Sequence, residues 1–184
     1  KVANKAKADA YIRIHANGSD NSSISGALTI CTTRNSPYIS SMYRKNKALS
    51  EAVLNAYVSV TGCRKEYVWE TDSMTGNNWS KVPTTIIEMG YMSNPTEDQK
   101  MATDEYQWQI VTGIANGVDQ YFAELVLERK QTNPALELIA VIPYRKRLDS
   151  LNKKTRTHEL LEACADVVVI QEKYLPSVYS HRNR

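Results

Sequence analysis

The sequence has few of the features that mark a disulfide scaffold, a zinc-finger domain or a membrane protein. It contains only three cysteines, Cys31, Cys63 and Cys164. They are widely separated and lack CxxC or Cys/His spacing, so we expect core or surface thiols rather than disulfides or a structural zinc knuckle. No apolar run approaches the ~18 residues that a membrane span requires.

A signal peptide is also lacking, because Lys1 opens directly on helix-like sequence. We therefore expect the chain to begin within a longer protein or after processing, and its compartment must be inferred from its function. Neither a complete GxGxxG turn nor a P-loop is present. Their absence argues against a conventional nucleotide-phosphate site.

Length and composition are those of an ordinary globular protein. The 184 residues are 42% hydrophobic and 23% charged, which suits one domain, or one domain with an appendage. The net charge of +3 arises in residues 123–184, which hold 11 Lys/Arg and 8 Asp/Glu, whereas residues 1–122 hold 12 of each. Basic clusters at Arg145–Arg147 and Lys153–Arg156 lack aromatic interleaving or a known motif, so we expect solvated loops and no nucleic-acid binding.

The first third of the chain alternates strand and loop patterns. Residues 8–15 contain β-branched residues and predict a strand that ends at His15. The polar residues 16–23 predict a loop, and a second strand is expected at about residues 26–33. His15 would thus lie at the carboxyl end of a strand, the edge at which open α/β sheets bind ligands.

A helix is predicted next, over about residues 37–60. Ser36 is a candidate N-cap, Pro37 would occupy the first turn, and Gly62 follows the last periodic residue. Proline at the start and glycine just past the end is the usual asymmetry of helices.

The middle of the chain contains one clear strand. Residues 63–82 show no clear period, and residues 75–80 have the composition of a loop. The strand at 84–89 includes Glu88. Asn94–Glu97 then supplies an N-cap, a first-turn proline and a capping-box acid, so a helix should begin there.

The last part of the chain begins with a long periodic stretch, which predicts one helix over about residues 104–130. Strands are predicted at 136–142 and 167–170, with a helix at 159–165 between them. Strand, helix and strand in this order are typical of a parallel sheet. The whole chain therefore predicts a three-layer α/β fold with a mostly parallel sheet flanked by helices.

Glu88 is unusual because it lies in an otherwise apolar strand. Burial penalises a charged carboxylate, so such a residue has either a strong partner or a pKa tuned for chemistry. His15 and Glu88 both end predicted strands and could project into one cleft. An imidazole on zinc and a carboxylate that deprotonates the bound water would suit metal-assisted hydrolysis. A hydrogen-bonded structural histidine and an acid near a helix start are the alternatives.

Five short motifs occur in residues 4–122. They are Asn4 with ADAYIRIHAN (8–17), TGNNWS (75–80), VPTTIIEMGYMSNPTED (82–98), YQ (106–107) and IANGVDQYF (114–122). Together they resemble the zinc-dependent N-acetylmuramoyl-L-alanine amidases of the amidase-3 class. The resemblance covers about two thirds of the chain.

This resemblance implies cleavage of the amide that joins N-acetylmuramic acid to L-alanine in peptidoglycan, by zinc-activated water. It implies that His15 is a zinc ligand and Glu88 the catalytic carboxylate, with Asn17 and Asn78 in the substrate cleft. It also implies a secreted or cell-wall protein, although the chain has no signal peptide and a cytoplasmic location stays open.

The zinc ligands are where the sequence departs from the family. The family's first zinc-binding His and its zinc-binding Glu have no counterpart here, and we expect both positions to lie upstream of Lys1. His158 and His181 belong to the unrelated tail, and one imidazole should not hold zinc tightly. The alternative to an enzyme is therefore an inactive amidase remnant that acts as a binding or interaction module.

A second resemblance concerns the end of the chain. The segments 119–127, 138–144, 165–170 and 174–183 resemble the YpsA family of the Rossmann-like SLOG superfamily, whose domains are thought to bind nucleotide-type ligands. We therefore predict an amidase-3-like domain lacking its N-terminal part over residues 1–122. Residues 123–184 would extend this incomplete fold as a Rossmann-like strand–helix–strand tail. The incomplete sheet would leave a free edge that could pair between copies of the chain.

Overall fold

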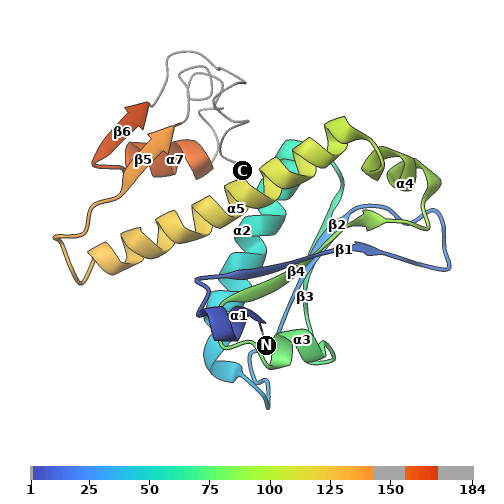
Figure 1. Ribbon diagram of the computed structural model, residues 1–184, viewed down its shortest axis with the longest axis horizontal. Helices are drawn as coiled ribbons and strands as arrows, with labels where there is room; N and C mark the ends of the chain where they lie inside the picture. Colours follow the sequence, from blue (N-terminus) through green and yellow to red (C-terminus); the bar gives the residue numbers. More distant parts are fainter. Residues whose placement is uncertain (1, 143–155, 170–184) are drawn as a thin grey trace. The chain divides into compact units, whose positions relative to one another are not determined.

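A computed structural model describes residues 2–142 and 156–169 (Figure 1). The chain divides into two compact units, Lys1–Tyr121 and Phe122–Arg184. Several features of the sequence lie outside the described residues: the cluster Arg145–Arg147, all but Arg156 of the second basic cluster, Ile170, and the segment 174–183 with His181.

The first unit alternates short strands with helices. In chain order its elements are α1 (Val2–Ala6), β1 (Tyr11–Asn17), β2 (Ala27–Cys31), the 3₁₀ helix η1 (Ser40–Met42), α2 (Tyr43–Thr61), β3 (Lys65–Glu70), α3 (Thr75–Asn78), β4 (Thr84–Tyr91), α4 (Pro95–Met101) and α5 (Asp104–Lys130). The helix α5 continues beyond Tyr121 and so belongs to both units.

The four strands form one mixed sheet in the order β1-β4-β2-β3. β1 pairs with β4 in parallel, and β2 pairs with β3 in parallel, whereas β2 and β4 run antiparallel. This confirms the predicted α/β fold, in which a mostly parallel sheet is flanked by helices. In the described part of the chain β1 and β3 are the edge strands.

The helix α2 covers one face of the sheet and is joined to it by buried polar contacts. The hydroxyls of Ser50 and Thr85 lie 2.7 Å apart, and the hydroxyl of Thr29 donates to the carbonyl of Ser50 at 3.1 Å. All three residues are buried. These hydrogen bonds satisfy polar groups that would otherwise be costly to bury.

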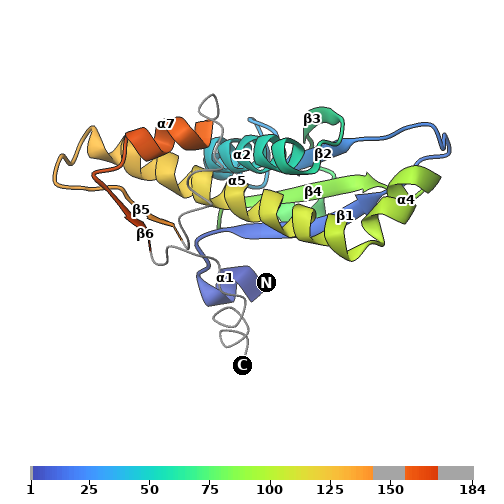
Figure 2. The same ribbon diagram turned by 90° about the horizontal axis from the view of Figure 1, so that it is seen from above.

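The helix α5 crosses α2 at two glycines (Figures 1 and 2). A Cβ atom on Gly117 would lie 2.5 Å from Cα of Val53, and one on Gly113 would lie 2.8 Å from Cα of Tyr57. Real Cβ atoms do not approach a backbone so closely. Glycine at these two positions therefore lets the helices pack backbone to backbone.

The helix predicted over residues 37–60 begins later than predicted. Residues 37–39 form a turn that leads into η1 and then α2. The Ser36 hydroxyl accepts a hydrogen bond from the amide of Tyr38 at 3.4 Å, so Ser36 supports this turn rather than capping a helix. The end was predicted well, because Gly62 follows α2 with a left-handed φ of 66°.

Two elements in the region without a clear period were not predicted. β3 was missed because its charged residues interrupt the apolar pattern of a strand. Two of them have partners elsewhere in the fold: Glu66 bonds to Tyr91, and Glu70 pairs with Lys47. The loop predicted over residues 75–80 was wrong over residues 75–78, where α3 forms a single helical turn. The amides of Asn77 and Asn78 donate to the carbonyl that precedes this turn, at 2.9 and 3.1 Å.

The start of α4 agrees with the predicted N-cap. The Asn94 side chain accepts from the amides of Thr96 and Glu97 at 3.0 and 3.2 Å. Glu97 does not complete a capping box, because its carboxylate accepts instead from the amides of Gly26 and Tyr91, each at 2.8 Å. Glu97 therefore ties the end of β4 to the loop that precedes β2.

The second unit contains β5 (Ile139–Ile142), α7 (Arg156–Glu162) and β6 (Asp166–Val169). The three elements follow the predicted strand–helix–strand order, and β5 and β6 pair in parallel. Arg156 forms ion pairs with Glu124 at 3.1 Å and with Glu159 at 2.8 Å. The resemblance to the YpsA family, and a nucleotide-type ligand, stay predictions.

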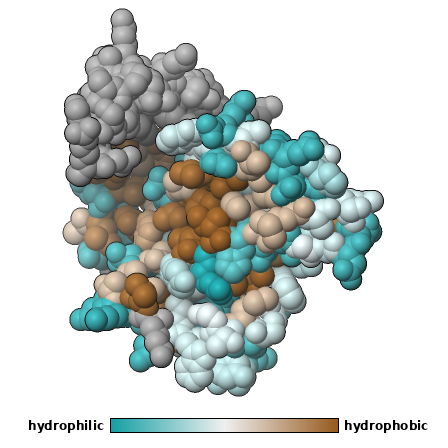
Figure 3. Space-filling view, turned by 45° about the vertical axis from the view of Figure 1, so that its right-hand side comes forward, coloured by the Kyte–Doolittle hydropathy of each residue, from teal (hydrophilic) through white to brown (hydrophobic). Residues whose placement is uncertain are grey.

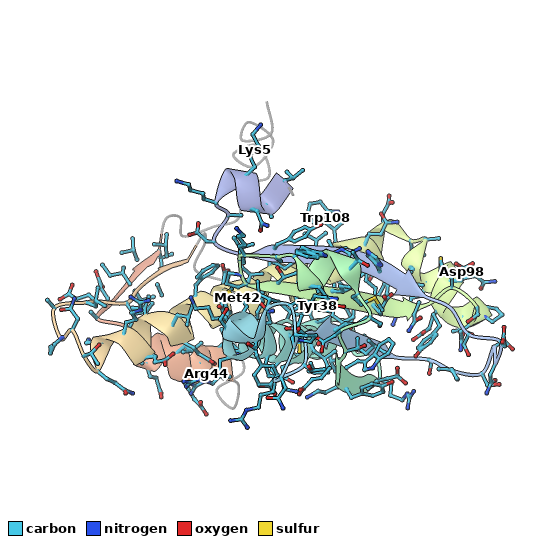
Figure 4. All side chains as sticks on the ribbon, turned by 90° about the horizontal axis from the view of Figure 1, so that it is seen from below. Lys5, Tyr38, Met42, Arg44, Asp98 and Trp108 are labelled. Atoms are coloured by element: carbon cyan, nitrogen blue, oxygen red, sulfur yellow. The ribbon has the colours of Figure 1, made fainter. Side chains whose placement is uncertain are left out.

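Apolar side chains also reach the surface, as the brown area in Figure 3 shows. Large exposed non-aromatic side chains of the first unit include Ile14, Met92 and Val111. The aromatic side chain of Trp108 on α5, labelled in Figure 4, is also exposed. None of the helices in residues 2–142 and 156–169 is both long and apolar enough to cross a membrane.

Candidate active site

His15 and Glu88 lie side by side on adjacent strands, although 72 residues separate them in the chain. β1 and β4 run parallel with His15 opposite Glu88 in register. Nδ1 of His15 is 3.8 Å from Oε1 of Glu88. The structure thus brings together the two residues that the sequence singled out, near the carboxyl ends of their strands.

The side chains beside Glu88 on the sheet are apolar. Leu28 lies opposite Glu88 on the antiparallel neighbour β2. Leu28, Ile30 and Ile86 form a buried cluster, against which Met74 packs from the segment before α3. This cluster explains why a charged side chain at Glu88 is poorly solvated.

Burial raises the pKa of Glu88, and electrostatic interactions with His15 and Arg13 lower it by less. The Glu88 side chain is 13% exposed, against 43% for His15. Its Oε2 atom is buried without a hydrogen-bond partner among the described residues. A carboxylate in such surroundings binds a proton more readily than an ordinary glutamate, which suits a general base.

The described residues do not complete a zinc site. No group of three His, Cys, Asp or Glu side chains that could hold a metal ion occurs within residues 2–142 and 156–169. His158 belongs to the second unit, where it pairs with Glu162 on α7 at 3.4 Å. Since catalytic zinc normally takes three protein ligands, His15 with Glu88 is an incomplete donor set.

The two asparagines that were predicted in the cleft make structural hydrogen bonds. Oδ1 of Asn17 accepts from the amide of Gly18 at 2.9 Å, and its carbonyl accepts from Met92 at 2.8 Å, just past a register shift in β1. Asn78 is buried in α3 and donates to the carbonyl of Asp72 at 2.6 Å. Contact of either residue with a substrate stays a prediction.

Arg13 is a residue of this site that was not predicted. It lies two residues before His15, so its side chain is on the same face of β1 as His15 and Glu88. Its guanidinium rests against Gly76 of α3, where an added Cβ would lie 2.7 Å from Nη1 and 3.1 Å from Cζ. The two-residue period of a strand was the signal in the sequence that could have identified it.

Residues 1–120 are similar to a known family of proteins. The family model for N-acetylmuramoyl-L-alanine amidase (Amidase_3) matches residues 1–120. YqiI of Bacillus subtilis strain 168 is 29% identical over 122 residues, which are 65% of this chain and 54% of YqiI. The probable cell wall amidase LytH of Staphylococcus aureus is 28% identical over 118 residues, which are 64% of this chain and 36% of LytH.

A solved structure shows the same fold. The N-acetylmuramoyl-L-alanine amidase of Clostridium difficile 630 superposes with a TM-score of 0.58 at 27% identity, over 66% of this chain and 61% of that chain. The chain spans about half the length of YqiI and less of LytH. Through residues 1–120, this chain belongs to the N-acetylmuramoyl-L-alanine amidase family.

Proposed function

We propose that this chain carries the general base of a peptidoglycan amidase, which hydrolyses the amide between N-acetylmuramic acid and L-alanine. The observation that carries the proposal is the pairing of Glu88 with His15 on adjacent parallel strands, at 3.8 Å. Since peptidoglycan lies outside the cell membrane, the same proposal places the working protein at the cell wall.

In this proposal Glu88 takes a proton from the attacking water. The water oxygen bonds to the amide carbon, and the carbon–nitrogen bond then breaks. Glu88 returns the proton to the departing nitrogen of L-alanine, so the carboxylate is regenerated. Its burial and its raised pKa favour both transfers, because a general base works best when its pKa approaches the working pH.

Zinc enters the proposal only through His15, which would serve as one of its ligands. The described residues do not supply the remaining ligands, so no step of the reaction is assigned to the metal. The zinc content of the chain after dialysis measures this part of the proposal directly.

The main test compares Glu88→Gln with the parent chain on a muramoyl-L-alanyl peptide, with zinc supplied. Release of the free peptide should fall by ~10²–10⁴-fold, the usual contribution of a general base. Glu105→Gln is the matched control, because Glu105 is an exposed glutamate in the first turn of α5. Equal activity of Glu88→Gln and the parent would refute the role of Glu88.

The second candidate is an inactive binding module, which the incomplete donor set favours. Substoichiometric zinc together with no turnover by the parent chain would refute the enzyme for this polypeptide. Sedimentation of the chain with insoluble peptidoglycan would then support the binding module. Stoichiometric zinc and turnover that depends on Glu88 would refute that module.

A further inference from the structure

Arg13 lies two residues before His15 on β1, on the same face of the sheet as His15 and Glu88. It is opposite Ile86 in β4, just as His15 is opposite Glu88. Two residues along a strand span about 6.7 Å. A group bound by Arg13 would therefore lie on the same face of the sheet as the Glu88 carboxylate, on which the charge of Arg13 acts.

The Arg13 guanidinium has no partner among residues 2–142 and 156–169. It forms neither a hydrogen bond nor an ion pair there, and its charge acts on Glu88 only from a distance. A guanidinium has five N–H donors in a fixed planar fork. A role as the counter-ion of Glu88 does not explain Arg13, because the two side chains do not form an ion pair.

The guanidinium of Arg13 lies against α3. Gly76 offers bare backbone against which the planar group rests, and a Cβ there would lie 2.7 Å from Nη1 and 3.6 Å from Nε. Packing of this kind restricts a long side chain before any ligand arrives. Less conformational entropy is then lost on binding.

We propose that Arg13 binds a carboxylate of the substrate's peptide stem, two residues from the amide that is cleaved. A planar guanidinium matches a carboxylate through two parallel hydrogen bonds. Two peptide residues span about 7 Å when extended, which is similar to the Cα spacing of Arg13 and His15 along β1. The inference rests on the proposed function, because it names the group that the same site recognises.

The test measures binding, so it does not depend on turnover. The full chain with Glu88→Gln is titrated by calorimetry with muramoyl-L-alanyl-D-glutamate, which has a free α-carboxylate, and with the analogue that has an amide there. The chain should prefer the carboxylate. Adding Arg13→Gln should weaken binding of the carboxylate ligand ~10–100-fold and change the amide ligand less than ~2-fold, as expected for loss of a charged hydrogen-bonding pair.

Three further variants separate recognition from charge and from folding. Arg44→Gln removes the same charge from the exposed surface of α2 (Figure 4) and should leave both affinities unchanged. Arg13→Lys keeps the charge without the planar fork and should fall between parent and Arg13→Gln. Gly76→Ala keeps the charge and displaces only the far end of a flexible side chain, so it should fold normally and still lose preference for the carboxylate.

The outcomes distinguish this inference from the proposed function. Equal affinity of the Glu88→Gln chain for the two ligands, equal loss of both in Arg13→Gln, or no binding of either ligand would overturn the role of Arg13. Selective binding without any hydrolysis by the parent chain would overturn the proposed activity and leave the carboxylate site standing.

Discussion

Glu88→Gln should make the fold more stable at neutral pH while it removes the proposed base. Burial raises the pKa of Glu88, so the folded state disfavours its ionised form. The free energy of unfolding should therefore fall as the pH rises from the unfolded pKa, near 4.3, through the raised folded pKa. Below the unfolded pKa the residue is neutral in both states and this cost disappears.

The size of the effect follows from one buried oxygen. Oε2 of Glu88 has no hydrogen-bond partner among the described residues, and an unsatisfied buried polar group costs ~1–3 kcal/mol. Glutamine keeps the shape and removes the charge but still buries a polar amide, so we expect a gain of ~1 kcal/mol at pH 7. In a chain of this length such a gain raises the melting temperature by ~2–4 °C.

The measurement is thermal unfolding followed by circular dichroism at pH 7 and pH 4. A chelator is present throughout, so that no metal ion offsets the charge of Glu88. Glu137→Gln, at an exposed glutamate outside any helix or strand, serves as the control and should not change the melting temperature at either pH. An unchanged or lower melting temperature of Glu88→Gln at pH 7 would contradict this argument, as would an equal gain at pH 4.

Three further predictions concern folding. Gly117→Ala should lower the free energy of unfolding in urea by ~1–3 kcal/mol or more, because the added methyl group would clash with the backbone of α2. Gly18→Ala is the control: a Cβ there has no atom within 4 Å, so this change should cost far less. Asn94→Ala should cost ~0.5–2 kcal/mol through loss of the α4 cap, and a smaller change in the urea midpoint would assign that helix start to packing. Burial raises the pKa of Asp72, but hydrogen bonds led by that from Thr33 outweigh burial and hold the pKa below the ordinary 3.8. The free energy of unfolding of the parent should therefore exceed that of Asp72→Asn by its full amount above about pH 5, and by less as the pH falls below 3.8. A difference that does not change with pH would exclude this linkage.

Much of the first unit could be predicted from the sequence because its signals are local. Asn94 and Gly62 mark helix ends through their own backbone chemistry, and the 3.6-residue period marked α5 over 104–130 without error. Local signals gave a wrong prediction where a side chain makes a different hydrogen bond from the one its position suggests. Ser36 precedes a proline and looked like a cap, but its hydroxyl stabilises a turn instead.

β3 was missed for a different reason. Its charged residues interrupt the apolar pattern, and the two half-buried ones have distant partners: Tyr91 for Glu66 and Lys47 for Glu70, the latter at 2.9 Å. A hydrophobic pattern cannot show which charges will be paired across the fold. Strand propensity in particular depends on tertiary context.

The sequence by itself determined which residues carry the candidate chemistry. Motif and strand-end position identified His15 and Glu88, because a carboxylate within an apolar strand is costly wherever that strand packs. Only the tertiary structure decided what surrounds them: that Leu28 lies opposite Glu88 in the sheet, and that the guanidinium of Arg13 lies against Gly76. These relations join segments far apart in the chain, and only strand pairing and helix packing bring such segments into contact.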